Sequence, residues 1–489
     1  MGRGISRAFT APEKAPQPPS YKTPPRQPRA GLPWRRAITL PVGLFQANSE
    51  SILLGTTTPP FQMKRGFYTI MTAQFFSSLA DNALFVAAVE LLKPLDHTGW
   101  QRAALVPMFA LFYVVLAPFV GAFADAHPKG KVMFISNAIK VVGCLMMLVG
   151  VHPLIAYAVV GLGAAAYSPA KYGILTELLP PSQLVKANGW IEGLTIASII
   201  LGVVLGGQLV GPVLSPWLLG LGVPGINSAA QAAMGAMVVV YALAAWFNTR
   251  IPLTGVQPHP MPSNWLVLLP DFFACNRKLW RDRLGQISLA TTTLFWGASG
   301  NLRYIVLAWA AAALGYSTTQ GSGLVGVVAI GTAIGAVIAS THMHLDRATR
   351  VMPLGILMGV LVVLMNWIDH FWLAAPFLIV LGAIGGFLVV PMNALLQHRG
   401  HMLMGAGRSI AVQNFNEQAA ILALGVGYST ATGAGLSTFA AITGFGVFVA
   451  LVMWVIQRWH QHNQRHHGDE LAEMLKLTRD DHHTDHRTH

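Results

Sequence analysis

Charged residues are scarce in this sequence: they make up 10% of its 489 residues, whereas 53% are hydrophobic. A soluble domain usually carries about 25% charged residues. A deficit spread over the whole length therefore excludes an ordinary soluble protein and indicates an integral membrane protein. Cysteine is almost absent as well, because Cys144 and Cys275 are the only two. They cannot form a disulfide framework, and no cluster of histidine and cysteine ligands occurs in the apolar segments. We therefore expect no metal site and no cofactor.

Acidic residues are outnumbered by basic ones, which gives a formal net charge of +13 and a pI of about 10.0. Such a balance also occurs in nucleic-acid-binding proteins. In a membrane protein, however, basic cytoplasmic loops are the simpler source. We therefore expect a membrane and no nucleic acid as partner.

The two ends of the chain differ from its middle. Residues 1–62 are rich in proline and arginine and contain neither a span of bilayer length nor a convincing leader segment. Either they form a disordered extension or translation starts at Met63, which opens MKRGFYTIMTAQFF. Residues 460–489 hold eight of the 17 histidines. Metal binding is conceivable there, but we expect a solvated, disordered cytoplasmic tail in which LAEMLKL has the pattern of a short helix.

Twelve apolar stretches of about 20 residues, the length that crosses a bilayer, follow residue 63. Their limits are 67–92, 103–124, 132–151, 153–176, 187–211, 227–248, 285–312, 320–341, 351–369, 371–396, 407–431 and 436–457. The longest connection, 250–284, divides them six and six. We therefore predict an all-α integral membrane protein with a first six-helix bundle (63–249), a cytoplasmic linker (250–284) and a second six-helix bundle (285–459).

Charge in the loops supports this count. If the N-terminus lies inside, the outside loops hold only Lys93 and Arg102. The inside loops then hold Lys64, Arg65, Lys129, Lys131, Lys186, Arg250, Arg277, Lys278, Arg281, Arg283, Arg347, Arg350, Arg399 and Arg408. By the positive-inside rule, this asymmetry predicts that both termini are cytoplasmic.

The two halves share motifs at corresponding positions. The first and seventh spans contain FSSLADNALF (76–85) and FWGASGNLRY (295–304), each with asparagine six residues after phenylalanine. The fourth and tenth contain GAAAYSPAKYGIL and GAIGGFLVVPMNALL, and aligning Pro169 with Pro391 places Lys171 opposite Asn393. The fifth and eleventh carry an amide residue four positions before a glutamate, at 188–192 and 413–417. A duplicated six-helix unit is typical of transporters.

Charges inside the spans are the strongest functional signal, because each costs about 2.5–3.5 kcal/mol on insertion scales. The spans hold Asp81, Lys140, Lys171, Glu192, Arg303 and Glu417. These residues either pair with one another and hold the bundle together, or line a cavity. We favour a cavity for the set, because both signs recur in the two halves. Its cations suit a phosphate, and its acids suit an ammonium group or protons. Pro169 frees a backbone carbonyl and lets Lys171 and Tyr172 face the interior. Lys171 lies about one turn from the cytoplasmic end of its span, where we expect a headgroup or gate contact.

The loop after the second span reads GAFADAHPKGK, from Gly121 to Lys131. Glycine permits close helix contact, Asp125 can cap or pair at a helix end, and Lys129 and Lys131 mark the cytoplasmic side. This resembles the G-x-x-x-D signature of the major facilitator superfamily, with extra spacing before the basic residues. The corresponding loop in the second half, THMHLDRATR, is degenerate.

Several long stretches together resemble the bacterial lysophospholipid transporter family within that superfamily. They are AQFFSSLADNALF, APFVGAFADAHPKGKVM, NAIKVVG, GAAAYSPAKYGILTEL, LVKANGWIEGLTIASIILG, LFWGASGNLRYIVLAW, GGFLVVPMNALLQHRG and GAGRSIAVQNFNE. The resemblance covers residues 64–459 and all twelve spans, but neither end of the chain.

The resemblance implies the fold of that superfamily and a flippase of the bacterial inner membrane. Such proteins move lysophospholipids, chiefly lysophosphatidylethanolamine, from the outer to the inner leaflet, where an acyltransferase/acyl-carrier-protein synthetase restores the missing chain. The substrate-binding positions that it implies are Asp81, Asn82, Lys140, Lys171, Tyr172, Glu192, Arg303, Asn414 and Glu417. The positions expected to act in gating are Gly121, Asp125, Lys129, Lys131, Pro169, Pro391 and Asn393.

Within this set we expect Arg303, Lys140 and Lys171 to include the phosphate contacts, through charge-assisted hydrogen bonds. Asp81, with Glu192 or Glu417, would meet the ethanolamine ammonium. A proton-coupled exporter of amphiphilic drugs or small molecules is the alternative, with the three acids as proton carriers. A membrane acyltransferase is disfavoured, because its chemistry commonly uses a histidine and an aspartate with four residues between them, whereas only three residues lie between His342 and Asp346. We therefore predict a transporter rather than an enzyme.

Overall fold

The computed structural model describes residues 65–92, 100–316 and 318–477, which form helices joined by turns and loops, with no strand among them. The predicted extension, residues 1–62, lies outside the described residues, as do residues 478–489 of the predicted tail.

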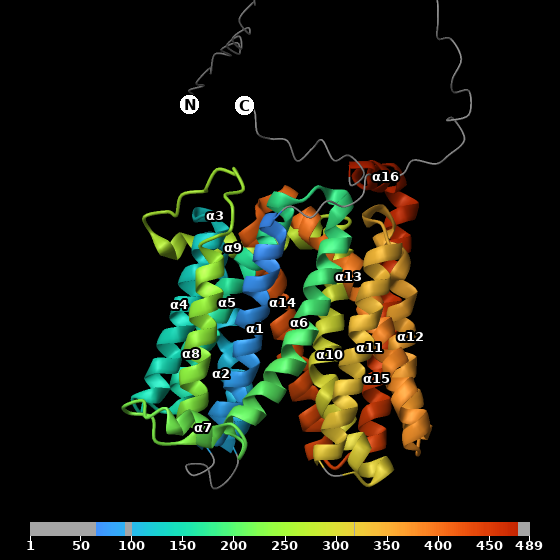
Figure 1. The fold of residues 1–489 in the computed structure, drawn as a ribbon. Coiled ribbons are helices and arrows are strands. Elements are labelled where there is room, and N and C mark those ends of the chain that lie inside the picture. The colour runs from blue at the N-terminus through green and yellow to red at the C-terminus, as the bar shows by residue number, and fades with distance from the viewer. Residues whose placement is uncertain (1–64, 93–99, 317, 478–489) are drawn as a thin grey trace, which may run out of the picture. The chain divides into compact units, whose positions relative to one another are not determined.

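The first half of the chain forms eight helices (Figure 1). They are α1 (Arg65–Leu92), α2 (Trp100–Val115), α3 (Ala117–Ala126), α4 (Lys129–Leu148), α5 (Pro153–Leu178), α6 (Pro181–Val210), the short α7 (Ser215–Gly220) and α8 (Ala229–Asn248). We refer to this set as the first bundle. The linker then contains a 3-10 turn, η1 (Trp265–Val267), which leads directly into α9 (Leu268–Arg281).

The second bundle follows the linker. It consists of α10 (Gly285–Leu314), α11 (Thr318–His342), η2 (Leu345–Val351), α12 (Met352–Leu364), η3 (Met365–Trp367), α13 (Phe371–Met404), α14 (Ala406–Gly433) and α15 (Thr438–His466). A last helix, α16 (Gly468–Leu477), ends the described chain. All twelve stretches predicted from hydropathy fall on helices of the two bundles.

Nine of the described helices are long and apolar enough to cross a membrane, and ten if the bent pair α2 and α3 is one span. The remaining two, α10 and α14, carry many polar residues and fall outside this set. The protein is therefore a multi-pass membrane protein of helical bundles. The count of twelve spans and the cytoplasmic placement of both termini stay predictions.

The predicted span at 103–124 is bent rather than straight. The segments Met108–Val115 and Ala117–Ala126 meet at an angle of 70°. Pro118, in the first turn of α3, has no N–H to donate to the carbonyl four residues earlier, and its ring clashes with that carbonyl, so the helix breaks. Leu116 takes the N-cap position of the new helix.

The tail also differs from expectation. We predicted a disordered tail from residue 460, but α15 continues to His466, and α16 follows it. The short helix at LAEMLKL is confirmed: Leu471 of α16 is buried against the second bundle.

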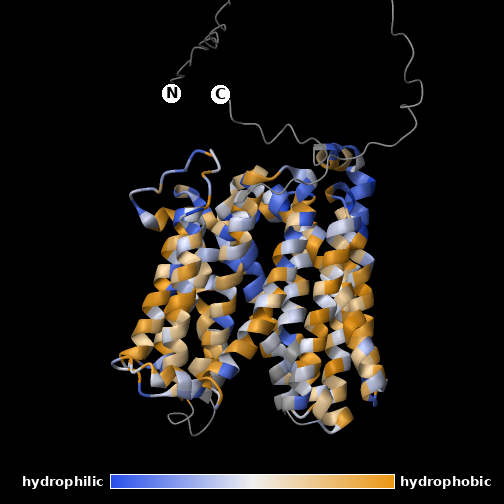
Figure 2. Cartoon of the chain, viewed as in Figure 1, coloured by the Kyte–Doolittle hydropathy of each residue, from blue (hydrophilic) through white to orange (hydrophobic). Residues whose placement is uncertain are grey.

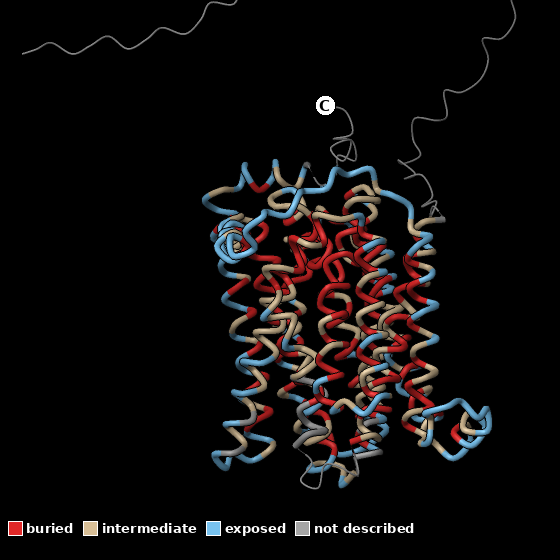
Figure 3. Tube along the Cα trace, turned by 90° about the vertical axis from the view of Figure 1, so that its left-hand side faces the viewer, coloured by how far each residue is buried: buried red, intermediate tan, exposed pale blue. Residues whose placement is uncertain are grey.

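The two bundles meet at one end. This end carries α3, α9 and the start of α14, lies uppermost in Figure 1, and is called the α9 end below. Toward the opposite end the ribbons of α6 and α10 diverge (Figure 1). Apolar residues predominate along the helices of both bundles (Figure 2), and buried residues concentrate toward the α9 end (Figure 3). The packing is therefore tightest at the end that the loop charges predict to be cytoplasmic.

Candidate functional site

A cavity of about 410 Å³ lies inside the first bundle. Residues of α1, α2, α4, α5 and α6 line it, and none of its lining residues comes from the second bundle. Four of the predicted substrate-binding residues line this cavity: Asp81, Asn82, Lys140 and Lys171. Residues up to 90 positions apart in the sequence are thus brought together around one cavity.

Close packing of α5 on α4 positions Lys140 in this cavity. A Cβ atom at Gly163 would lie 2.7 Å from Cγ of Lys140 and 2.7 Å from the backbone oxygen of Ser136. Only glycine therefore lets the two helices approach so closely at this level. The lysine is 1% exposed and extends toward α1.

Asp81 and Lys140 form an ion pair with 2.8 Å between Nζ and Oδ2. The other carboxylate oxygen of Asp81 accepts a hydrogen bond of 2.7 Å from the Tyr241 hydroxyl. Lys140 also donates to the Ser77 hydroxyl at 3.0 Å and lies over the Tyr167 ring, 5.1 Å from its centroid. The charges of Asp81 and Lys140 are thus largely compensated within the protein. The sequence analysis missed Ser77, Tyr167 and Tyr241, whose only signal is a hydroxyl group in an otherwise apolar span.

Lys171 has a different environment. Its side chain is buried, and its Nζ lies 4.0 Å from the centroid of the Tyr172 ring. The Tyr172 hydroxyl in turn donates to Oε1 of Glu192 at 3.2 Å. Within the described part of the chain, no carboxylate lies in ion-pair distance of Lys171. The cavity therefore contains two lysines in different states: Lys140 is paired with a carboxylate, whereas Lys171 contacts the face of the Tyr172 ring.

The corresponding polar residues of the second bundle cluster around Gln413. Its amide nitrogen donates to Oε1 of Glu417 at 2.8 Å and to Oδ1 of Asn393 at 3.0 Å. Asn414, the next residue of α14, donates to the Ser168 hydroxyl at 2.8 Å, and Ser168 lines the cavity. The second bundle thus reaches the site through Asn414. Arg303 lies in α10, but its side chain is outside the described residues.

A reciprocal amide pair joins the bundles closer to the α9 end. Asn188 of α6 and Gln397 of α13 each donate to the other's carbonyl oxygen at 2.9 Å, and both are fully buried. Asn188 belongs to the repeated motif found in the sequence, whereas Gln397 was missed. The sequence feature that could have indicated Gln397 is its polar amide, one helical turn after Asn393 in an apolar helix.

The predicted gating motif lies at the α9 end and contacts the opposite bundle. Asp125 accepts hydrogen bonds from the backbone N–H groups of Gly407 at 2.6 Å and Arg408 at 2.9 Å. These groups belong to the first turn of α14, so a carboxylate of the first bundle caps a helix of the second. A Cβ atom at Gly121 would lie 2.7 Å from the Cβ of Ala411 in α14, so this glycine permits the approach.

Lys129 reinforces this contact from the first bundle. Its Nζ lies 3.1 Å from Asp125 and 3.1 Å from Glu177, and it donates to the backbone oxygen of Ala124 at 2.7 Å. Lys131 is exposed. Pro169 and Pro391 lie inside the unbroken helices α5 and α13 and are buried.

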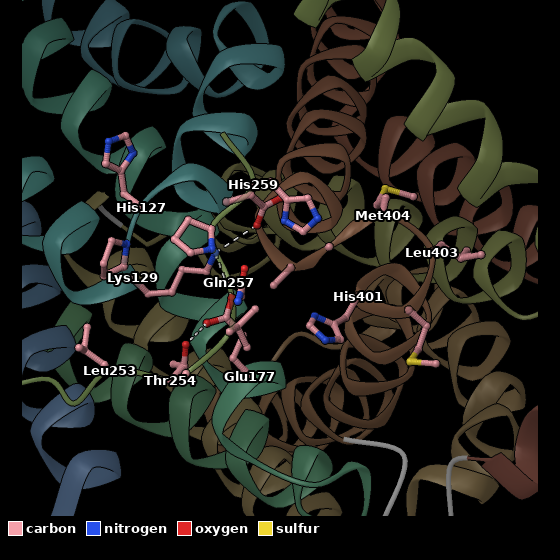
Figure 4. A pocket seen from close by; sticks show the side chains of 18 residues that line it. His127, Lys129, Glu177, Leu253, Thr254, Gln257, His259, His401, Leu403 and Met404 are labelled. Atoms are coloured by element: carbon pink, nitrogen blue, oxygen red, sulfur yellow. Dashed lines mark hydrogen bonds and ion pairs between the residues drawn. The ribbon is translucent and has the colours of Figure 1, made fainter. Parts of the chain in front are cut away.

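A second cavity, of about 810 Å³, adjoins the gate contacts (Figure 4). The α3–α4 turn, linker residues 253–259 and the α13–α14 turn line it, with His127, His259 and His401 around it. Its acids already have partners: Glu177 pairs with Lys129 and accepts from the Thr254 hydroxyl at 2.8 Å. The smaller cavity is therefore the candidate substrate site.

Two helical bundles that meet at one end, with a charged cavity in the membrane interior, define a transporter of the alternating-access type. The sequence model of the Major Facilitator Superfamily matches residues 70–423 of this chain. The chain is similar to the lysophospholipid transporter LplT of Yersinia enterocolitica, with 42% identity over 361 residues, 74% of this chain and 85% of that protein. It is 41% identical to LplT of Enterobacter sp. strain 638 over 399 residues, 81% of this chain and 96% of that protein.

Solved structures agree on the fold. The transporter FucP in its outward conformation superimposes with a TM-score of 0.64 at 12% identity, over 81% of this chain and 98% of that one. A bacterial homologue of the iron transporter ferroportin in an outward-facing state gives a TM-score of 0.63 at 15% identity, over 81% and 100%. This chain belongs to the major facilitator superfamily and, within it, to the family of the LplT proteins. The predicted family and fold class are confirmed.

Proposed function

We propose that this protein is a lysophospholipid flippase of the bacterial inner membrane. It moves lysophospholipids, chiefly lysophosphatidylethanolamine, from the outer to the inner leaflet, and an acyltransferase/acyl-carrier-protein synthetase then re-acylates them. The names and the 41–42% identity of its curated relatives support the substrate class. The direction, the headgroup and the acyltransferase partner rest on the family resemblance.

The observation that carries the proposal is the unequal state of the two lysines in the cavity. Lys140 is held by Asp81 at 2.8 Å and is almost completely buried. Lys171 has a ring face at 4.0 Å instead of a carboxylate, so its charge is available to an anionic ligand. A phosphodiester fits this arrangement, because a charge-assisted hydrogen bond to phosphate is stronger than a neutral one.

An ethanolamine ammonium would meet the acidic side of the same cavity. Asp81 is more exposed than its ion-pair partner Lys140: 20% of the Asp81 side chain is accessible, against 1% of the Lys140 side chain. It would contact the ammonium while keeping Lys140, or exchange one partner for the other. Apolar lining residues, among them Phe85, Phe109 and Ile199, would contact the start of the acyl chain.

The transport cycle follows from the position of the gate contacts. With Asp125 bound to the start of α14 and Asn188 paired with Gln397, the α9 end is closed. The substrate therefore enters from the opposite end or from its lateral membrane side. Rocking of one bundle against the other would break these contacts and open the α9 end. Asn414 of α14 donates to Ser168, which lines the cavity, so a bound substrate would directly affect this contact between the bundles.

The test is headgroup-resolved uptake into proteoliposomes that contain the purified protein. We expect inward movement of lysophosphatidylethanolamine, and at least tenfold slower transport by Lys171→Gln, with the loss mainly in apparent affinity. Arg458→Gln, which changes an exposed arginine of α15, is the matched control and should transport normally. Full transport by Lys171→Gln would refute the assigned phosphate contact, and no lysophospholipid movement by the wild type would refute the function.

A proton-coupled exporter of amphiphilic molecules is the second candidate. Glu192 and Glu417 favour it, since both are buried and receive hydrogen bonds from neutral donors, Tyr172 and Gln413. Such carboxyl groups are suited to carry protons. Lysophospholipid transport that continues without a proton gradient would exclude this mechanism. His342 and Asp346, the weak enzyme motif, lie at the end of α11 and in η2 and do not line the cavity, which is consistent with a transporter family.

A further inference from the structure

The linker helix α9 runs across the ends of both bundles. Trp265, in the turn that leads into α9, contacts Phe119 of α3 with 5.6 Å between ring centroids. Trp280, near its other end, stacks on Trp459 of α15 with 6.5 Å between centroids. One end of this segment thus touches the first bundle and the other end touches the second, as Figure 1 also indicates. Its axis therefore lies across the spanning helices and along the membrane surface.

The contacts of α9 also set its depth. Phe272 packs edge-on against Phe415, with 5.3 Å between ring centroids. Phe415 lies nine residues after Ala406, the start of α14, so it is about 14 Å from that end. Phe272 and Cys275 also share a buried cluster with Leu396 of α13 and Ala411 of α14. Helix α9 therefore lies against the last turns of the spanning helices at this end, where we expect lipid headgroups.

One face of α9 is docked on the protein, and a second apolar face is not. Its docked face consists of Leu268, Phe272, Cys275 and Leu279, which are buried. Beside it lie Leu269 and Phe273 of α9, four residues apart, and Leu266 of the preceding turn η1. These three side chains are 37%, 56% and 51% exposed, respectively. Such a stripe is unfavourable in water, at about 25 cal/mol per Å² of apolar surface.

The charges of α9 complement a phospholipid surface. Arg277 follows Phe273 by one turn and is exposed, and Arg281 follows it by a further turn. The acidic residue of α9, Asp271, projects from another side of the helix and pairs with Arg408 at 3.0 Å. The stripe thus ends in cations, which is the pattern of a helix lying in a membrane interface.

We propose that α9 is an interfacial helix that binds anionic phospholipid in the leaflet at this end, with the Leu266, Leu269 and Phe273 stripe in the acyl boundary and Arg277 and Arg281 on the headgroups. The depth of the stripe and its adjoining arginines favour lipid over a protein partner. This inference needs the membrane placement of the bundles but is independent of which substrate they carry.

Depth-dependent fluorescence quenching tests this proposal in the full-length protein. With Cys144 and Cys275 replaced by alanine, an environment-sensitive label is placed at Phe273→Cys, with Leu269→Cys as a second stripe position. Ala274→Cys, which is exposed but points about 100° away from Phe273, is the matched control. The proteins are reconstituted in brominated phosphatidylcholine or brominated phosphatidylglycerol.

We expect both stripe positions to be quenched at least threefold more than Ala274→Cys, and more by the anionic lipid than by the zwitterionic one. Arg277→Gln combined with Arg281→Gln should abolish the preference for the anionic lipid while quenching by phosphatidylcholine persists. Equal, weak quenching at stripe and control positions would overturn the proposal. Stripe labels shielded from both brominated lipid and aqueous iodide would overturn it in favour of a protein partner or a second copy.

Discussion

Removal of the Asp125 carboxylate should open the α9 end. In the wild-type structure this side chain accepts hydrogen bonds from the N–H groups of Gly407 and Arg408 at 2.6 and 2.9 Å. It also pairs with Lys129, which has a second carboxylate partner, Glu177, at 3.1 Å. Asp125→Ala therefore removes the cap of α14 but leaves Lys129 paired within the first bundle.

The size of the effect follows from the contacts. Loss of a helix cap costs about 0.5–2 kcal/mol, and loss of a negative charge from a helix N-terminus costs up to about 2 kcal/mol in a partly buried site. Because the two contributions overlap, we take about 2 kcal/mol for the sum. This cost falls on the state in which the bundles meet at the α9 end. The population of the opened state should therefore rise roughly 30-fold, at 1.36 kcal/mol for each factor of ten.

The native Cys275 reports this change. It belongs to a buried cluster with Ala117 of α3 and Ala411 of α14, so separation of these helices exposes it. Burial, with a smaller contribution from the Asp271 carboxylate, raises the pKa of the Cys275 thiol. Only the thiolate reacts with maleimide, so labelling of the closed state at neutral pH is slow. Opening exposes the thiol and returns its pKa toward the ordinary value, which accelerates labelling.

We expect maleimide to label Cys275 about 30-fold faster in Asp125→Ala than in the wild type. As the pH is raised, the labelling rate should reach its plateau at a lower pH in the variant than in the wild type. Cys275→Ser removes the signal and shows that buried Cys144 does not contribute. Asp369→Ala, which removes an exposed carboxylate at the opposite end of the second bundle, should label at the wild-type rate. Labelling of Asp125→Ala within twofold of the wild type would refute the role of this cap.

Two further changes test the buried polar contacts. Asp81→Asn or Lys140→Met alone should destabilise the protein by about 3–5 kcal/mol in thermal unfolding, because each leaves a buried charge unpaired. The double variant should recover most of this loss, and additive losses would contradict the ion pair. Asn188→Leu should cost about 1–3 kcal/mol, because it leaves the buried Gln397 amide without its partner. Asn188→Leu should also accelerate labelling of Cys275. The double variant Asn188→Leu with Gln397→Leu should be closer to the wild type in stability. Unchanged stability of Asn188→Leu alone would contradict the pair.

Much of the fold was predictable because a bilayer constrains sequence strongly. Backbone polar groups in hydrocarbon must be bonded within helices, so apolar length indicates where helices run. All twelve predicted stretches coincide with helices for this reason. The break at Leu116 was missed because Pro118 lies in an apolar run that hydropathy alone reads as continuous. The helical continuation to Leu477 was missed because it depends on burial of Leu471 against the second bundle.

The sequence pointed to three charged residues of the candidate cavity but not to the groups that they contact. Charges inside spans stand out from composition alone, which is how Asp81, Lys140 and Lys171 were found. Whether a lysine is compensated depends on hydroxyl groups and carboxylates from other helices, such as Tyr241 beside Asp81. These give no signal in the sequence, because one hydroxyl in an apolar helix is common.

The sequence by itself determined the membrane class and the charged positions within the spans, since both follow from composition. It predicted the duplicated bundles from repeated motifs, and the resemblance to the major facilitator superfamily predicted the gating motif around Asp125. Only the tertiary structure decided which charges meet. The capping of α14 by Asp125 joins residues 282 and 283 positions apart, and the Asn188–Gln397 pair spans 209. Contacts of this range depend on how two rigid bundles lie against each other, and that arrangement is set by helix packing and by the state of the transport cycle.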